Sequence, residues 1–249
     1  MKDDYTDVFR SAAAAAKYDE VVYAPGSPAA LINERQRTFL RELVGSGFGG
    51  IRPVQHDFAC GTGRAIENLV GCVSAAHGYD TSTEMIERAR ARGLPAEFHP
   101  IPADGPIPEP AGTNGTPAIV TMFRLFLNVG PDVRDRAVAF AAKALPTADS
   151  GLLVIENHGN RSSLRHLSGL RKRGRDGWFN ELSHAEVSDL LARYGFQIED
   201  LHGFALLPQG THRKAGLRPL ARAVDAAGSR LHTLAPYARC VLYIARRAR

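Results

Sequence analysis

The chain has 249 residues, of which 44% are hydrophobic and 23% are charged, as is usual for a soluble globular protein. This composition excludes a disordered chain, which lacks the apolar side chains needed to offset the entropy of ordering. Lys and Arg (31) outnumber Asp and Glu (26), so the formal net charge is +5 at pH 7. A modest positive charge fits a solvated surface, and it also fits an anionic small molecule or nucleic acid as partner.

The composition also limits the compartment and the use of cysteine. Three cysteines are too few for a disulfide framework, and their spacing fits no zinc site. The first residues are acidic and contain no apolar run of signal-peptide type, and no stretch is apolar enough for a transmembrane helix. We therefore expect a cytoplasmic protein.

Two helices are expected at the start of the chain. Ala is the strongest helix former, so the alanine run at residues 12–16 predicts a helix, which the prolines and glycine at 25–28 end. In residues 29–44 the apolar side chains recur at the spacing of one helical face. The glycines between 45 and 50 are expected to close this second helix.

Short strands and helices then alternate. The pairs Thr81/Glu84 and Ser183/Glu186 have the spacing of a capping box at a helix start, and Asp132 is expected to cap another helix. Helices are therefore expected at 64–70, 82–92 and 132–145 and after Ser183. Strands are expected at 54–58, 73–80, 96–101, 118–123, 151–156, 196–207 and 240–246.

This order predicts the fold class. Strands that alternate with helices indicate an α/β protein with a doubly wound, mostly parallel sheet, and we expect one domain over residues 1–249. The stretch at 102–117 is rich in Pro and Gly and is expected to be a loop. The last two strands are separated by a long segment, and an antiparallel pairing of the two at one edge is an alternative.

The clearest motif follows the first expected strand. Residues 57–63 (DFACGTG) place two glycines and an alanine where a strand turns into a helix, so backbone N–H groups can approach a ligand closely. Ligands of open α/β sheets bind at the carboxyl ends of such strands. Asp80 ends the next strand, where a carboxylate can accept both hydroxyls of a ribose. The third glycine of a dinucleotide fingerprint and the Gly-Lys-Ser/Thr of a P-loop are absent, and a tight turn without ligand is the alternative.

These residues resemble the motifs of class I S-adenosylmethionine-dependent methyltransferases. Residues 57–63 are similar to the glycine-rich motif I of that family, with Ala59 in a slot often held by Gly, and residues 78–85 (GYDTSTEM) are similar to its acidic-loop motif. The resemblance extends over residues 35–205. It implies a Rossmann-like, seven-stranded sheet whose last strand, 239–247, runs antiparallel between the fifth and sixth strands, and it implies S-adenosylmethionine as cofactor.

The resemblance also assigns a cofactor site. Asp80 would hold the ribose hydroxyls, Asp104 would face the adenine amino group, and Phe123 and Arg124 would lie beside the methionine part. Cys60 at a helix start suggests a nucleophile, but members of the family carry Cys here without using it covalently. The cofactor residues assigned in this way are Asp57, Ala59, Cys60, Gly61, Thr62, Gly63, Asp80, Thr81, Met85, Ala103, Asp104, Phe123 and Arg124.

The acceptor side is less defined, because an in-line methyl transfer depends mainly on proximity and alignment and needs no catalytic motif. His158 follows the fifth strand and is the best placed base, since a neutral imidazole takes up a proton near pH 7; a loop histidine bonded to the backbone is the alternative. Three segments are expected to border the acceptor: a lid at 1–28 and insertions at 157–182 and 208–236, the last two rich in Arg and Lys. The residues expected to contact the acceptor are Asn128, Arg161, Trp178, Tyr18 and Tyr23.

Three functions fit these features. The first is methyl transfer to an oxygen or nitrogen of a small molecule, such as a secondary metabolite or a sugar-like compound with an anionic group. The second is methylation of nucleic acid, which the charge favours but which the lack of a binding module and of an Asn-Pro-Pro-Tyr-type motif after the fourth strand disfavours. The third is a cofactor-binding scaffold, or an enzyme that uses the sulfonium for another displacement. The expected partner is a small-molecule acceptor, and a homodimer is one candidate assembly.

Overall fold

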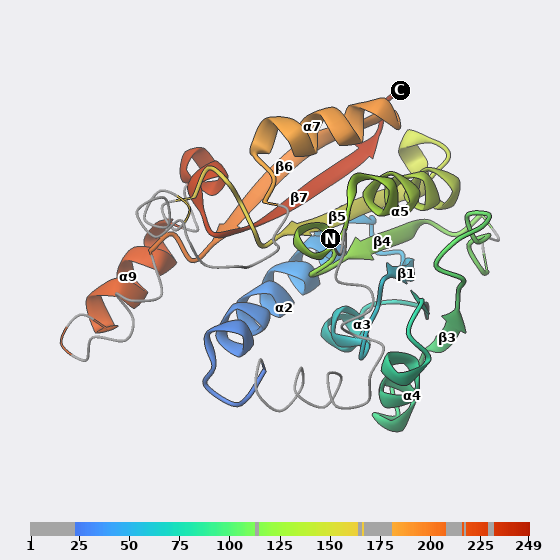
Figure 1. The fold of residues 1–249 in the computed structure, drawn as a ribbon, viewed down its shortest axis with the longest axis horizontal. Helices are drawn as coiled ribbons and strands as arrows, with labels where there is room; N and C mark the ends of the chain where they lie inside the picture. Colours follow the sequence, from blue (N-terminus) through green and yellow to red (C-terminus); the bar gives the residue numbers. More distant parts are fainter. Residues whose placement is uncertain are drawn as a thin grey trace.

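A seven-stranded sheet of order β3-β2-β1-β4-β5-β7-β6 forms the centre of the molecule, with helices on both faces (Figure 1). The structure, a computed structural model, describes residues 23–112, 115–163, 166, 181–207, 216, 218–228 and 232–249. β7 pairs antiparallel with β5 and β6, whereas β1 to β5 pair in parallel. The doubly wound sheet and its antiparallel last strand are thereby confirmed. The strands are β1 (Val54–Phe58), β2 (Ala75–Asp80), β3 (Glu97–Pro100), β4 (Ala118–Met122), β5 (Gly151–Asn157), β6 (Phe196–Phe204) and β7 (Cys240–Arg247).

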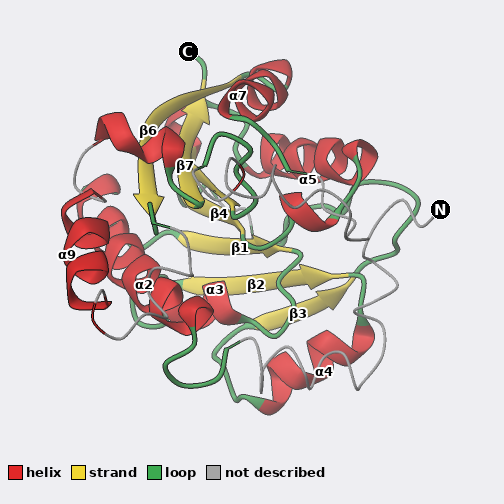
Figure 2. Cartoon of the chain, turned by 60° about the vertical axis from the view of Figure 1, so that its left-hand side comes forward, coloured by secondary structure: helices red, strands yellow, loops and turns green. Residues whose placement is uncertain are grey.

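The helices divide between the two faces of the sheet (Figure 2). α5 and α7 cover one face, and α2, α3 and α4 cover the other. The described helices are α2 (Pro28–Gly47), α3 (Arg64–Leu69), α4 (Thr83–Ala91), α5 (Pro131–Ala144), α7 (His184–Arg193) and α9 (Arg218–Gly228), with shorter 3₁₀ turns at η3 (Phe126–Asn128), η4 (Ala148–Ser150) and η7 (His232–Tyr237). In the described part of the chain, none of these helices combines the length and apolarity needed to cross a membrane.

The core follows from the alternation of side chains along the central strands. Ile119 and Val120 are adjacent in β4, point to opposite faces of the sheet and are both fully buried. Val120 packs in the cluster that includes Phe140 of α5, and Ile119 packs in the cluster that includes Leu40 of α2. A strand that is buried on both faces appears in the sequence as a continuous apolar run, which is why β4 and β5 are readily predicted.

The starts of two helices differ from the prediction. Ser82, and not Thr81, caps α4, because the Ser82 backbone is extended and its Oγ accepts a hydrogen bond from the Met85 N–H at 3.3 Å. Gly130, and not Asp132, is the residue before α5. Asp132 instead lies in the first turn of α5, where the positive end of the helix dipole stabilises a carboxylate.

Among the described residues, the other predicted boundaries lie within three residues of those in the structure; the helix predicted around the alanine run at 12–16 lies outside the described residues. The capping box at Ser183 is confirmed, since Ser183 Oγ accepts from the Glu186 N–H and the Glu186 carboxylate accepts from the Ser183 N–H. The second predicted helix runs on to Gly47, two glycines further than the sequence pattern indicated.

A loop takes the place of a helix beside β3. The connection from β3 to β4 contains no helix in its described residues, 101–112 and 115–117. This loop covers the α5 side of β2, because the Ala111 N–H donates to the Tyr79 hydroxyl at 2.8 Å and Ile107 packs against the core. β3 is thus an edge strand whose only partner in the sheet is β2.

Candidate active site

A cavity of about 360 Å³ opens at the carboxyl ends of the parallel strands β1, β2 and β4. Its size and position are those of small-molecule sites in open α/β sheets. It brings together most of the residues that the sequence pattern selected: Asp57, Ala59, Cys60, Gly61, Thr62, Asp80, Thr81, Met85, Ala103, Asp104, Phe123, Arg124, Asn128 and Tyr23 all line it.

The glycine turn after β1 places its backbone against this cavity. Ala59, Gly61 and Gly63 have φ angles of 59°, 53° and 79°, in the left-handed region that favours glycine. A Cβ at Gly61 would meet no protein atom within 4 Å, so this backbone faces open space. A Cβ at Gly63 would lie 2.8 Å from Leu94 Cδ1, and Gly63 does not line the cavity. The lack of a side chain at Gly63 therefore allows close packing, whereas at Gly61 it leaves the backbone open to the cavity.

Asp80 connects the glycine turn to the end of β2. Its Oδ2 accepts a hydrogen bond from the Gly61 N–H at 2.7 Å, and its Oδ1 accepts one from the Ser82 N–H at 2.9 Å. Burial raises the pKa of the Asp80 carboxyl, and these N–H donors oppose the rise. A carboxylate has about four acceptor positions, and the backbone N–H groups of Gly61, Ser82 and Thr81 bond to this one, so capacity is left for a ribose hydroxyl.

Asp57 lies at the end of β1 and is 1% exposed. The Thr121 hydroxyl donates to Asp57 Oδ1 at 2.7 Å, and Gln55 Nε2 donates to Thr121 Oγ1 at 3.2 Å. Burial raises the pKa of Asp57 to about 7; the Thr121 hydrogen bond opposes this shift, and the charge of Asp80 adds to it. The cavity therefore contains a carboxyl group that titrates near neutral pH.

Cys60 does not act as a nucleophile in this arrangement. Burial raises the pKa of its thiol well above the ordinary value, and the negative charges of Asp80 and Asp57 raise it further. Only the thiolate is nucleophilic. At neutral pH the Cys60 side chain is thus a small apolar part of the wall.

The segment after β3 is positioned by α5. The Arg136 guanidinium lines the cavity and donates to the carbonyl of Ala103 and, at 3.3 Å, to the carbonyl of Pro106. These bonds hold the short stretch that carries the exposed Asp104. Arg136 was missed in the sequence because it lies in the middle of a helix, far from any motif.

The turn after β4 is held by a buried carboxylate. Glu156 of β5 is 3% exposed and accepts hydrogen bonds from the Arg124 N–H at 2.8 Å, from Gln36 Nε2 at 2.9 Å and from Cys240 Sγ at 3.1 Å. Arg124 has a φ of 58°, and its carbonyl accepts from Asn128 Nδ2 at 2.6 Å. Glu156 therefore sets the conformation of the wall formed by residues 123–128.

Residues from the N-terminal side of β1 also line the cavity. The Arg64 guanidinium lies over the Tyr23 ring, 3.7 Å from its centre, and Tyr23, Arg64 and Asn33 of α2 are all lining residues. Mutual amide hydrogen bonds join Asn33 to Asn68 of α3. Phe58, Ser82 and Leu125, which lie within segments that the sequence indicated, also line the cavity. Further lining residues that the sequence did not indicate are Ala65, Ile101, Val129 and Val133.

Other selected residues lie away from the cavity. His158 follows β5 and is buried, but it does not line the cavity, so its role as a base stays a prediction. Arg161 is exposed at the surface, where it pairs with Glu186 at 3.2 Å and donates to the carbonyl of Glu181. Tyr18, Trp178, most of the lid and parts of both insertions lie outside the described residues.

The sheet order with an antiparallel β7, and the glycine turn bonded to the acid that ends β2, define a class I methyltransferase fold. A family model described as a methyltransferase domain matches residues 57–201, more than half of the chain, and the chain belongs to this family. It is an S-adenosylmethionine-dependent methyltransferase.

Solved structures agree with this fold. The magnesium protoporphyrin IX methyltransferase of Synechocystis, solved with bound S-adenosylhomocysteine, has a TM-score of 0.59 at 14% identity, over 98% of this chain and 97% of that chain. A chain from the complex of the Haloferax volcanii Trm112 methyltransferase activator with a methyltransferase has a TM-score of 0.58 at 14% identity, over 88% and 93%. A methyltransferase of Clostridium acetobutylicum has a TM-score of 0.56 at 13% identity, over 93% and 96%. No curated protein sequence matches the chain.

Proposed function

We propose that the enzyme transfers the methyl group to an oxygen or nitrogen of a small molecule. The observation that carries this proposal is a single cavity that contains the cofactor residues and, at its β4 end, an apolar wall of Phe123, Leu125 and Val129 with the polar Arg124 and Asn128. An apolar wall with a few polar groups is typical of a small-molecule site. The fold is shared with an enzyme named for a small molecule, magnesium protoporphyrin IX.

Some residues of the cavity are proposed to bind the cofactor, and others to bind the acceptor. In this proposal Asp80 accepts hydrogen bonds from the ribose, Asp104 from the adenine amino group, and the Gly61 turn lies against the rest of the nucleoside. When bound, the cofactor supplies an electrophilic methyl group. The lone pair of the acceptor would form the new bond to carbon as the carbon–sulfur bond breaks, S-adenosylhomocysteine would be the leaving product, and the proton of the acceptor would pass to solvent or to a base.

In this proposal the cavity acts mainly by alignment. No histidine or lysine is among the described residues that line it; its acidic side chains are Asp57, Asp80 and Asp104, and its positive side chains are Arg64, Arg124 and Arg136. We propose that Arg124, beside the acceptor wall, orients an anionic group of the acceptor, because a guanidinium binds carboxylate or phosphate in two-point geometry. Correct alignment of the reacting atoms is then the main source of rate.

Calorimetry with Asp80→Asn tests the cofactor site. Loss of hydrogen bonds to a charged acceptor is worth about 1.5–3 kcal/mol, so we expect binding of S-adenosylmethionine and S-adenosylhomocysteine to weaken at least about tenfold. Asp149→Asn, an exposed carboxylate outside the cavity, is the matched control. Equal affinity in the two variants would contradict the assignment of Asp80.

The products identify the reaction. With a labelled methyl group, the proposal predicts label in a small acceptor together with S-adenosylhomocysteine. Methylthioadenosine as product would show a different displacement, and label only in nucleic acid would show the wrong acceptor class. Cofactor binding without turnover against a broad panel of anionic and neutral small molecules would favour a scaffold.

A further inference from the structure

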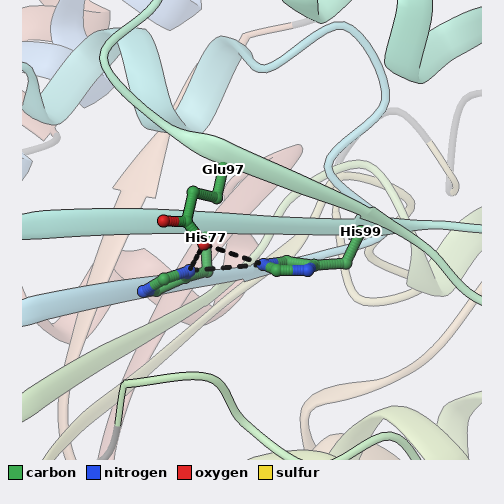
Figure 3. A group of neighbouring side chains, drawn as sticks. All are labelled: His77, Glu97 and His99. Carbon is green, nitrogen blue, oxygen red and sulfur yellow. Dashed lines mark hydrogen bonds and ion pairs between the residues drawn. The ribbon is translucent and has the colours of Figure 1, made fainter.

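Three potential metal ligands meet at the β3 edge of the sheet, outside the methyltransferase cavity. His77 lies on β2, and Glu97 and His99 lie on β3 (Figure 3). The parallel register pairs His77 with Glu97 and Tyr79 with His99. Because residues two apart on a strand share a face, all three side chains extend from the same face of the sheet. The cavity lining includes none of the three.

The ligand atoms are spaced as in a coordination shell. His77 Nδ1 lies 3.3 Å from His99 Nε2 and 3.5 Å from Glu97 Oε2, and His99 Nε2 lies 3.9 Å from Glu97 Oε2. A triangle with these sides has a point about 2.1 Å from every corner. Bonds from Zn²⁺ to imidazole nitrogen and to carboxylate oxygen are about 2.0–2.2 Å long. The three separations therefore match those that one such ion requires.

The chemistry of the donors selects the kind of ion. Two imidazoles and one carboxylate suit Zn²⁺ and similar divalent transition metals, whereas Mg²⁺ and Ca²⁺ prefer an all-oxygen shell. The His77 side chain is 9% exposed and the Glu97 side chain 74%, so the site is closed on the protein side and open toward solvent.

The surroundings hold both rings in place. His77 stacks on His56 with ring centres 5.5 Å apart, and His99 stacks on Tyr79 at 5.0 Å. Gly112 passes close behind His77, since a Cβ at Gly112 would lie 3.1 Å from His77 Nε2. Packing of this type fixes the orientation of a ligand before an ion arrives, and an ion then binds with less loss of side-chain freedom.

We propose that His77 Nδ1, His99 Nε2 and Glu97 Oε2 bind one divalent ion of the Zn²⁺ type, with water in the fourth position. The ion joins the edge strand β3 to β2 at a position apart from the methyl-transfer cavity. The competing arrangement is a metal-free hydrogen bond between the two histidines with Glu97 paired to them.

Glu97→Gln is the most direct variant, since Glu97 is exposed and the amide has almost the same shape. Glu87→Gln, an exposed glutamate on the neighbouring α4, is its control. His99→Gln removes a ring stacked on an aromatic side chain, and His202→Gln is matched to it because His202 stacks on Phe39 with ring centres 4.2 Å apart.

The test is equilibrium dialysis of the chelator-treated full chain against ZnCl₂, with metal analysis and thermal unfolding. We expect one equivalent of Zn²⁺ and a higher Tm with zinc in the wild type and in both controls. Loss of a ligand is expected to weaken binding at least about tenfold in Glu97→Gln and His99→Gln and to remove the rise in Tm. No saturable equivalent in the wild type, or the same affinity in all four variants, overturns the proposal and leaves the metal-free arrangement. S-adenosylmethionine affinity, measured in parallel, is expected to stay unchanged in Glu97→Gln.

Discussion

The buried carboxyl of Asp57 predicts an unusual pH dependence of stability. Its pKa is about 7 in the folded protein against an ordinary value of 3.8, with burial as the main cause. Between these two values the folded state binds more protons than the unfolded state, so the free energy of unfolding falls as pH rises. At about 1.4 kcal/mol for each pKa unit, the loss between pH 4 and pH 8 is at most about 4 kcal/mol.

Asp57→Asn removes this dependence while it keeps the local hydrogen bond. The amide oxygen of the new side chain can still accept from the Thr121 hydroxyl, which donates to Asp57 Oδ1 at 2.7 Å in the wild type. The buried His56 has the opposite effect on the wild-type curve, because burial lowers its pKa to about 4 and its contribution to stability rises with pH. The test is therefore the difference between the two proteins. In thermal unfolding of the free enzyme from pH 5 to pH 8, we expect the Tm of the wild type to fall relative to that of Asp57→Asn as pH rises. At pH 8 the variant should have the higher Tm, by about 10 °C, since 1 kcal/mol shifts Tm by about 2–4 °C in a domain of this size.

Asp104→Asn is the control for stability, because Asp104 is exposed in the same cavity. The Tm of Asp104→Asn should depend on pH in the same way as that of the wild type. If Asp57→Asn is less stable than the wild type at pH 8 and has the same slope, the assignment of a buried, destabilising charge to Asp57 is wrong.

Cofactor binding should be linked to the same proton. The sulfonium and ammonium groups of S-adenosylmethionine are cations, and a cation near Asp57 favours its charged form. Binding near pH 7 is then expected to release a proton, and affinity is expected to rise by up to about tenfold from pH 6 to pH 7 and to level off above that range. Calorimetry in buffers of different ionisation enthalpy measures the proton count. Proton uptake, or the same release in Asp57→Asn, would contradict this linkage.

Three further variants test packing around the cavity. Glu156→Gln places an amide N–H donor where three donors already meet. We therefore expect the free energy of unfolding, measured with denaturant, to fall by about 1–3 kcal/mol, and methyl transfer to become slower. Gly63→Ala is expected to lower Tm, because its Cβ clashes with Leu94. Gly61→Ala should cost only about 1–2 kcal/mol of backbone strain but should weaken cofactor binding in calorimetry, since its Cβ projects into open space. Similar effects of the two glycine variants on both Tm and affinity would refute the assignment of Gly63 to packing and of Gly61 to cofactor binding.

Features that depend on neighbouring residues could be predicted from the sequence. The run from Asp57 to Gly63 is a strand, a turn and a helix start in one short stretch, and its position follows from the order of elements alone. Asp80 lies next to it because adjacent parallel strands end at the same edge of the sheet, and its bond to Gly61 spans only 19 residues. The helix cap at Ser82 was missed for a local reason: Thr81 carries the same kind of hydroxyl, and only the backbone angles decide between them.

The histidine cluster shows why register matters. His77, Glu97 and His99 form no metal-binding motif in the sequence, because the spacing between the two strands is set by α4 and a turn. They meet only when His77 is paired with Glu97 across the strands. A shift of one residue in this pairing would move Glu97 and His99 to the opposite face.

The acceptor wall depends on contacts that are still more distant in sequence. Glu156 is joined to Gln36 across 120 residues and to Cys240 across 84 residues, and these contacts hold the Arg124 turn. The family model matches residues 57–201, so Gln36 and Cys240 both lie outside the matched residues. The glycine turn and Asp80 lie within the matched residues, whereas the Arg124 turn is also held by these two residues outside them. Acceptor specificity is therefore expected to follow α2 and β7 as well as the turn itself, and low-identity relatives with the same fold need not share the acceptor.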